Sequence, residues 1–309
     1  TSTADRTAVV QVDGSLSGRN YGIDFSSGYR DATGAAGIDP SLRIAVAGSV
    51  QGGGGVRLSY GGNASIDVAQ GGSITGTGIT NVGTFSILDQ GTSLPGTLTL
   101  TNAGSLVGGV SAGGGRALLL DNTGTLDGAG GAAVVLSNSN VLNLRGGSVR
   151  GDIVSGYLMG SDTTVNWTGG SVTGGIAIGS GNIRVSGLSA ADYAGLTRLS
   201  NDFGESTLSL DGLQFRGGSL SGNDPSQGIN LGFNWRTISL SNGSAAVLTG
   251  DRLTLSSSYG QADASVNLDA SSRLTVGAGQ TLGASSGQFV FNNAGLLDLS
   301  QSGAPDWLR

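Results

Sequence analysis

The sequence predicts an all-β protein that winds into a parallel β-helix, a solenoid of short strands. The first observation is a five-residue phrase (Gly, then Ser or Thr, then Val, Ile or Leu, then any residue, then Gly) that occurs eight times. The second is that apolar and polar residues alternate in short runs beside these phrases. The third is composition, with 59 glycines among 309 residues. Such a recurring phrase indicates that one supersecondary unit stacks on the next, each burying the face its neighbour leaves open.

The intervals between the phrases set the expected number of turns. The phrases begin at Gly14, Gly48, Gly72, Gly104, Gly124, Gly147, Gly170 and Gly218. Four of the seven intervals are close to one another in length, the last is about twice as long, and the first and third look like one turn plus an insertion. At roughly 20–24 residues per turn, the 309 residues would form about 13–15 coils.

The alternating runs predict strands. Runs such as Leu98–Leu100, Leu208–Leu210 and Val266–Leu268 place their apolar side chains on one face of a strand. The polar partners are mostly Ser, Thr and Asn, which suit a solvated face. Gly, Asn or Asp-Gly bound most runs and supply the positive φ of tight turns. Because each Gly inside a helix costs about 0.5–1 kcal/mol relative to Ala, a chain so rich in Gly cannot be mainly helical.

Two stretches interrupt the repeat. The first, 19–43, is rich in aromatic residues and predicts either a flap over the first coils or a ligand-contacting loop. The second, 188–203, predicts a short helix near 190–199, because Ser189 and Asp192 fit a capping box and apolar residues follow Tyr193 at three-residue steps. This helix would either cover a groove or form a binding arm.

Both stretches supply candidate binding residues. If these segments contact a ligand, the residues expected to do so are Tyr21, Phe25, Tyr29, Asp192, Tyr193 and Arg198.

Composition excludes several kinds of chemistry. The sequence has no His, no Cys and no Lys, which rules out a Ser–His nucleophile, a Cys–His pair, a His-ligated zinc and a Schiff-base lysine within this segment. We therefore predict no metal and no cofactor. The net charge of −6 with no basic cluster argues against nucleic acid as a partner. No apolar run is long enough to span a membrane.

Carboxylate chemistry is what composition leaves open. Enzymes that cleave polysaccharides occur on β-helices and group Asp residues on one face, and the candidates here are Asp121, Asp127, Asp251, Asp263 and Asp269. Several of them sit beside Gly or Asn, where a carboxylate caps its own turn. We therefore predict that the chain is not an enzyme, and keep a carbohydrate-active enzyme as an alternative.

Short phrases also resemble a known family. Asn-x-Gly phrases occur at 81–85, 102–106 and 122–126, and the end of the chain contains Phe289–Ser300 followed by Ala304-Pro305-Asp306. These resemble the passenger domains of autotransporters, the surface-displayed part of type V secreted proteins in Gram-negative bacteria. The general character of the repeats is similar over the whole chain, whereas the specific motifs cover only a short part of it.

The resemblance implies a right-handed, mostly three-sided β-helix of the pertactin type. Residues 1–309 would then be a single passenger domain, displayed at the cell surface, with the C-terminal membrane barrel absent and the passenger itself outside the membrane. The absence of Cys agrees with passage through the outer membrane in an unfolded state. The family pattern implies no catalytic residues.

The predicted function is that of an adhesin or a self-associating protein. Its lateral faces and loops would bind a host cell surface, a matrix protein, a glycan or another copy of the chain, through many weak contacts that multivalency strengthens. One alternative is a structural stalk that displays another domain. Others are the Asp-based enzyme and an ice-binding protein, which would need evenly spaced ranks of Thr.

Overall fold

The computed structural model describes residues 7–26, 41–59, 62–77, 85, 87–90, 96–113, 116–137, 139–155, 162–201, 206–212, 214–217, 229–231, 235–248, 253–255, 264–276, 282–284 and 288–298. The chain divides into two compact units, Thr1–Leu158 and Met159–Arg309. We call them unit 1 and unit 2 and describe each by itself. Within the described residues the regular structure is all strand, with no helix.

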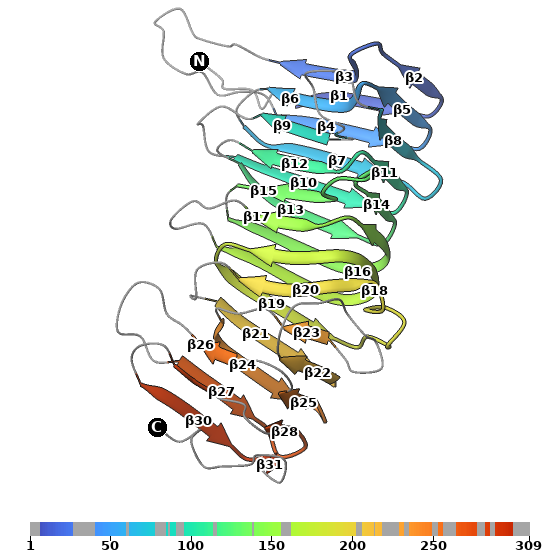
Figure 1. Ribbon diagram of the computed structural model, residues 1–309. Helices are drawn as coiled ribbons and strands as arrows, with labels where there is room; N and C mark the ends of the chain where they lie inside the picture. Colours follow the sequence, from blue (N-terminus) through green and yellow to red (C-terminus); the bar gives the residue numbers. More distant parts are fainter. Residues whose placement is uncertain are drawn as a thin grey trace, which may run out of the picture. The chain divides into compact units, whose positions relative to one another are not determined.

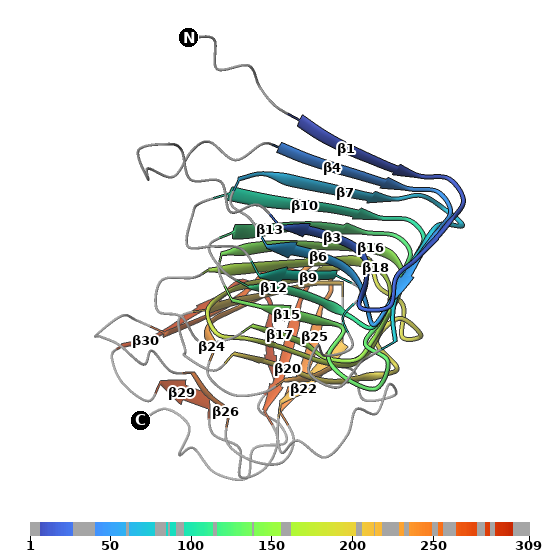
Figure 2. The same cartoon turned by 90° about the horizontal axis from the view of Figure 1, so that it is seen from above.

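Unit 1 is a three-sided parallel β-helix. Successive strands of the chain fall in turn on three sides, and each strand pairs in parallel with the strand one turn later, as Figures 1 and 2 show. The first side contains β1 (Thr7–Val12), β4 (Ser41–Val46), β7 (Ala64–Val68), β10 (Gly96–Asn102), β13 (Arg116–Asn122) and the first part of β16 (Asn140–Arg150). The second contains β2 (Ser15–Ser17), β5 (Ser49–Gly52), β8 (Ser73–Gly76), β11 (Ser105–Val107), β14 (Thr125–Asp127) and the last part of β16. The third contains β3 (Tyr21–Ser26), β6 (Gly54–Ser59), β9 (Ile87–Gln90), β12 (Val110–Gly113), β15 (Val134–Leu136) and β17 (Ile153–Ser155).

The recurring phrase forms the second side of unit 1. Its Ser or Thr residues align in one row from turn to turn, and so do the aliphatic residues that follow them. The aliphatic row is Leu16, Val50, Ile74, Leu106, Leu126 and Val149. From Val50 to Val149 these side chains are at most 2 % exposed, so the repeat builds a continuous apolar stack.

From the second phrase of unit 1 onward, the glycine that opens the phrase is needed because adjacent turns touch there. A Cβ on Gly124 would lie 2.2 Å from the carbonyl oxygen of Gly104, and one on Gly104 would lie 2.2 Å from that of Gly72. The same carbonyl oxygens accept hydrogen bonds from the next turn: Thr125 N–H donates to Gly104 O at 2.8 Å and Ser105 N–H to Gly72 O at 3.0 Å. A side chain at this corner would therefore push apart the hydrogen bonds that hold successive turns together.

The Asn-x-Gly phrases place amides inside the core. Asn102 and Asn122 are both 0 % exposed and are aligned on adjacent strands. Asn102 Nδ2 donates to Asn122 Oδ1 at 2.7 Å, and Gly104 N–H donates to Asn102 Oδ1 at 3.2 Å. Asn122 Nδ2 donates to Gly124 O at 3.2 Å. These bonds satisfy the buried amides while fixing the corner that each glycine turns.

A buried ion pair interrupts the apolar core of unit 1. Asp89 occupies an inward position aligned with Leu58 and Ala112 on neighbouring turns. Arg116 Nη1 lies 3.4 Å from Asp89 Oδ1, and both side chains are 0 % exposed. The pair joins β9 on the third side to β13 on the first side. Removing charges from water is costly, so each partner depends on the other.

Unit 2 repeats the parallel stacking. Its first side contains the first part of β18 (Thr163–Ile178), then β19 (Gly181–Ser186), β21 (Ser206–Asp211), β24 (Trp235–Ser241), β27 (Ala264–Leu268) and β30 (Phe289–Asn293). A second side runs, in order of pairing, from the end of β18 through β20 (Leu196–Asn201), β23 (Ile229–Leu231), β22 (Gln214–Gly217), β25 (Ala245–Leu248) and β28 (Arg273–Val276) to β31 (Leu296–Asp298). The strands β26 (Leu253–Leu255) and β29 (Leu282–Ala284) pair with each other.

The parallel β-helix is thus as predicted, but the turns are less uniform than expected. The shortest turn between described first-side strands leads from Thr163 to its aligned partner Gly181, and among the longest is that from Thr7 to Ser41. Several other turns are also much longer than the shortest one. Among the described strands, the first side holds six in each unit.

The helix predicted near 190–199 is wrong. Residues 190–195 form turns, and Leu196 already begins β20. The three-residue step from Leu196 to Leu199, which resembled a helical face, comes from a β-bulge opposite Gly174 and Gly175. The bulge turns two residues outward in succession, so that both leucines are buried. The Ser189–Asp192 pair caps a tight turn instead of a helix.

Part of the stretch 19–43 is also regular. Residues 21–26 form β3, which pairs in parallel with β6, and Ser41 begins β4. The alternation of Tyr21, Ile23 and Phe25 with smaller residues is a strand pattern, although the high aromatic content resembled a loop. Residues 27–40 lie outside the described part of the chain.

The corner glycines give a matched test of the stacking. Gly124→Ala places a Cβ against Gly104 O, and we expect it to lower the free energy of unfolding by roughly 1–3 kcal/mol, as overpacking does. Gly14→Ala is the control, because Gly14 holds the same place in its phrase and a Cβ there meets nothing within 4 Å. Denaturant unfolding monitored by circular dichroism measures both. Equal stability of the two variants would contradict close approach at this corner.

The buried ion pair gives a second test. Arg116→Met leaves the Asp89 carboxylate buried without its cation, and we expect a loss of about 3–5 kcal/mol in unfolding free energy. The double variant D89L/R116M replaces both charges by apolar groups and should be clearly more stable than R116M. If the double variant is as unstable as R116M, the two side chains do not act as a pair.

Candidate binding surface

The predicted aromatic candidates of β3 are engaged in contacts within unit 1. The Arg57 guanidinium lies 4.6 Å from the centre of the Tyr21 ring. Arg57 also donates to Asp24 through Nε at 2.9 Å and Nη2 at 2.5 Å, and this carboxylate raises the pKa of Arg57 above its ordinary value. Phe25 is half-buried on the inward side of β3, where it aligns with Leu58. Tyr29 lies outside the described residues.

The three candidates of unit 2 lie around one turn but do not form one surface. Asp192 Oδ2 accepts hydrogen bonds from Ser189 N–H at 2.7 Å and Ser189 Oγ at 2.8 Å. Tyr193 is only 6 % exposed, so it belongs to the core. Arg198 is exposed on β20 at the bulge.

The outer face of the first side of unit 2 is a more continuous candidate. Two rows of outward residues follow the pairing register without a gap. One row is Thr164, Asn182, Thr207, Thr237, Ser265 and Val290, and the other is Asn166, Arg184, Ser209, Ser239, Asn267 and Asn292. We call these two rows the polar face. Apart from Arg184 and Val290, every member carries an uncharged hydroxyl or amide.

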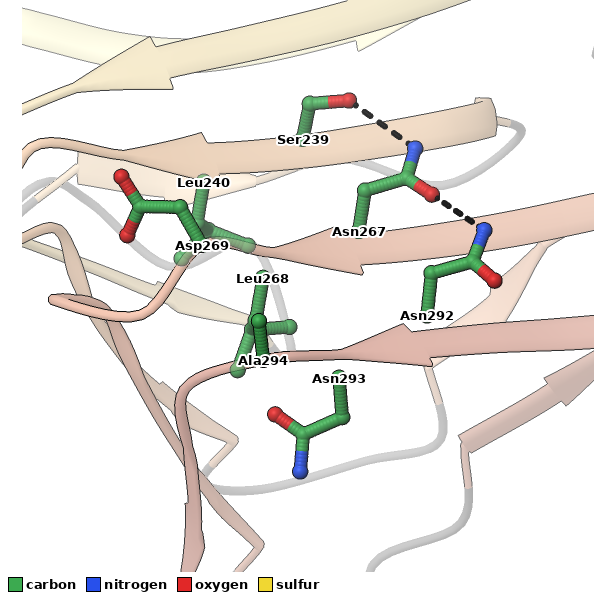
Figure 3. A pocket seen from close by; sticks show the side chains of 8 residues that line it. All are labelled: Ser239, Leu240, Asn267, Leu268, Asp269, Asn292, Asn293 and Ala294. Atoms are coloured by element: carbon green, nitrogen blue, oxygen red, sulfur yellow. Dashed lines mark hydrogen bonds between the residues drawn. The ribbon is translucent and has the colours of Figure 1, made fainter.

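Side chains of the polar face bond to one another along its rows. Asn292 Nδ2 donates to Asn267 Oδ1 at 2.8 Å, and Asn267 Nδ2 donates to Ser239 Oγ at 3.1 Å, as Figure 3 shows. In the neighbouring row, Thr237 Oγ1 and Ser265 Oγ are 3.1 Å apart. The bonds hold the amides in one orientation. Side chains fixed in this way lose little conformational entropy when a ligand binds.

An open groove adjoins this row where it meets the next corner. The groove has a volume of about 520 Å³ and is shown in Figure 3. Its lining comes from three successive strands and the turns after them: Ser239, Leu240, Asn267, Leu268, Asp269, Asn292, Asn293 and Ala294. Amides and a carboxylate therefore surround a partly apolar floor, a combination that provides both hydrogen bonds and contact area.

Asp269 at the edge of this groove organises the turn. Its carboxylate accepts hydrogen bonds from Ser272 Oγ at 2.7 Å, from Asn242 N–H at 2.7 Å, and from the N–H and Oγ of Ser271 at 3.0 and 2.9 Å. These donors, with Ser272 first, lower the pKa of Asp269 to about 2. A carboxylate so fully bonded to its own turn and to the preceding coil is poorly suited to act as a general acid.

The outer face of the first side of unit 1 has a different character. Its two corresponding rows are Val9, Arg43, Ser65, Thr99, Leu119 and Val141, and Gln11, Ala45, Asp67, Thr101, Asp121 and Asn143. Apolar residues are exposed here, including Val9 at 64 % and the aligned pair Leu119 and Val141. Arg–Asp pairs bridge adjacent turns, such as Arg145 Nε with Asp121 Oδ1 at 3.0 Å. The uncharged character therefore belongs to unit 2.

The described Asp candidates for catalysis are occupied in other contacts. Asp121 pairs with Arg145, and Asp127 accepts from Ala129 N–H at 2.8 Å while Arg150 Nη1 lies 3.8 Å away. Asp251 and Asp263 are outside the described residues. Within the described ranges, no three His, Cys, Asp or Glu residues are grouped in a way that could hold a metal ion.

Comparison with known proteins gives no relative: no family model, no curated protein and no solved structure matches this chain. In the part of the chain that the structure describes, there is no helix of the length and apolar character that a membrane span requires.

The polar face was not predicted from the sequence, although several of its residues were already assigned to solvated strand faces. Ser209, Ser239 and Asn267 are the middle residues of alternating runs and were expected to be solvated. That they form one row follows only from the pairing register. The register depends on turns of unequal length, which the sequence alone does not align.

The lowered pKa of Asp269 predicts an acid-dependent stability. Because the pKa falls from 3.8 to about 2 on folding, the carboxylate contributes stability that is present above pH 3.8 and is lost as the pH falls toward 2. Wild type should melt at a higher temperature than D269N above this window, and the difference should shrink toward pH 2. Melting curves across the pH series measure it, and a constant difference would show that the charge plays no part.

Proposed function

We propose that the chain is the β-helical passenger of a surface-displayed autotransporter, acting as an adhesin or a self-association protein. The observation that carries this proposal is the polar face of unit 2, whose two rows extend over six strands and carry hydroxyl and amide groups at every position except Arg184 and Val290. The assignment to autotransporters rests on the parallel β-helix together with the Asn-x-Gly and C-terminal phrases.

The chemistry of the polar face favours attachment over catalysis. Hydroxyl and amide groups donate and accept hydrogen bonds but do not activate a nucleophile without a base. Each contact with a hydrated partner contributes little, since it replaces a bond to water. Repetition along the face, and over many copies on a cell, converts these weak contacts into firm attachment.

The polar face can contact partner surfaces of either positive or negative charge. The chain carries a net charge of −6, which repels other acidic surfaces at long range. On the polar face only Arg184 is charged, so the close contact region adds little repulsion. Glycans, matrix proteins and a second copy of the chain all present groups that this face can bond.

Display of the full-length gene product on a non-adherent Gram-negative strain tests the proposal. We expect wild-type cells to clump or to attach to host cells or matrix, and the variant S239A/N267A/N292A to do so roughly tenfold less, because multivalent attachment falls steeply with the number of contacts. The matched control is S26A/S59A/S111A, which alters three residues of the third side of unit 1 and should behave like wild type.

The outcomes separate the elements of the proposal. Purified segments of each variant should give the same circular dichroism spectrum and melting temperature, so that loss of attachment is not loss of folding. If cells with S239A/N267A/N292A attach fully and cells that lack residues 1–309 do not attach, the adhesive surface lies elsewhere on these residues. Unchanged behaviour after deletion would refute an adhesive role and leave the stalk as the better interpretation.

A further inference from the structure

The corner between β24 and β25 contains an Asn-Gly turn, and Asn242-Gly243 is the sole Asn-Gly pair in the sequence. Ser244 N–H donates to Ser241 O at 3.2 Å, which closes a four-residue turn around the pair. Both central residues have positive φ, 54° for Asn242 and 78° for Gly243. This is the type I′ geometry that Asn-Gly favours. Both residues are exposed.

Two side chains of the following turn hold this pair. Asn242 N–H donates to Asp269 Oδ2 at 2.7 Å, and Gly243 N–H donates to Ser271 Oγ at 2.9 Å. The second bond is important, because the Gly243 nitrogen is the atom that would attack the Asn242 side chain in a spontaneous deamidation. While it donates to Ser271, this nitrogen is held in place by the next coil.

We propose that Asn242 is a deamidation site whose rate is set by the Ser271 hydroxyl of the next coil. The Gly243 nitrogen attacks Cγ of Asn242, the N–Cγ bond forms, and the Cγ–Nδ2 bond breaks. Ammonia leaves with the proton from the Gly243 nitrogen, which gives a five-membered succinimide. One water molecule then opens either carbonyl of the ring and yields aspartate or isoaspartate. The reaction needs no other reagent.

The product would change the corner beside the groove. The succinimide nitrogen has no hydrogen, so the bond from Gly243 to Ser271 Oγ is lost in the intermediate. The product places a new carboxylate on the residue whose N–H already contacts Asp269. Like charges on such neighbouring residues repel, and isoaspartate also lengthens the backbone of a tight turn. Because Asp269 lines the groove, deamidation would alter that end of the polar face as the protein ages.

The test compares four purified proteins during incubation in mildly alkaline buffer: wild type, S271A, S271T and N242G. Peptide mass spectrometry measures conversion of Asn242 from amide to acid, and an isoaspartate assay identifies the product. We expect S271A to convert about two- to tenfold faster than wild type, the change that loss of one ordinary hydrogen bond produces. S271T keeps the hydroxyl and should match wild type. N242G keeps a turn residue that allows positive φ and should give no product at this position.

Melting temperatures measured in parallel show whether each variant is folded. Equal conversion rates in folded S271A and wild type would overturn the proposal. If S271A does not fold, wild type alone decides: its conversion should be at least about tenfold slower when folded than in denaturant, and a ratio near one would overturn the gating by Ser271. Neither result depends on whether the chain is an adhesin.

Discussion

Close contact between successive turns is the constraint on which this structure depends. In unit 1, the carbonyl oxygen of one corner glycine accepts the N–H of the next phrase, and the space beside it is too small for a Cβ. That contact fixes the distance between turns at the spacing of paired strands. Once the corners are in register, the aliphatic rows of all three sides are in register as well, and their burial supplies the stability.

The same constraint explains which polar groups the core admits. Asn102 and Asn122 are buried at the corner, where each amide donates to a main-chain carbonyl and the Gly104 N–H donates to Asn102. Asp89 and Arg116 form an ion pair with each other. In both cases at least one partner comes from another turn, so a shift of one turn against the next would deprive a buried amide or charge of that partner. These groups specify one register between turns, whereas aliphatic rows alone would also permit shifted registers.

Much of this fold could be predicted from the sequence, because the features that define it are local. The phrase with its opening glycine and the alternating runs identified the parallel solenoid. What depends on distant residues could not be predicted. The step from Leu196 to Leu199 has the spacing of a helix, and only the pairing of β20 with β18 shows it to be a bulge. The polar face likewise needs the register of strands that loops of unequal length separate, and nothing near Ser239 in the sequence indicates Asn267.

The outward positions are where such a fold is free to carry function. Inward positions accept Val, Ile or Leu almost interchangeably, since only the volume and apolar character of each row matter. Corners must keep glycine or a side chain that bonds to the turn, as Asp269 does. Outward residues neither fill the core nor form the corners, so their side chains are free to vary and can suit a binding partner. Unit 1 uses them for exposed apolar residues and for ion pairs between turns, while unit 2 uses them for a continuous uncharged row. A row built from many equivalent positions gains strength by repetition instead of by one deep site, which is why attachment over a broad surface is the function that this arrangement favours.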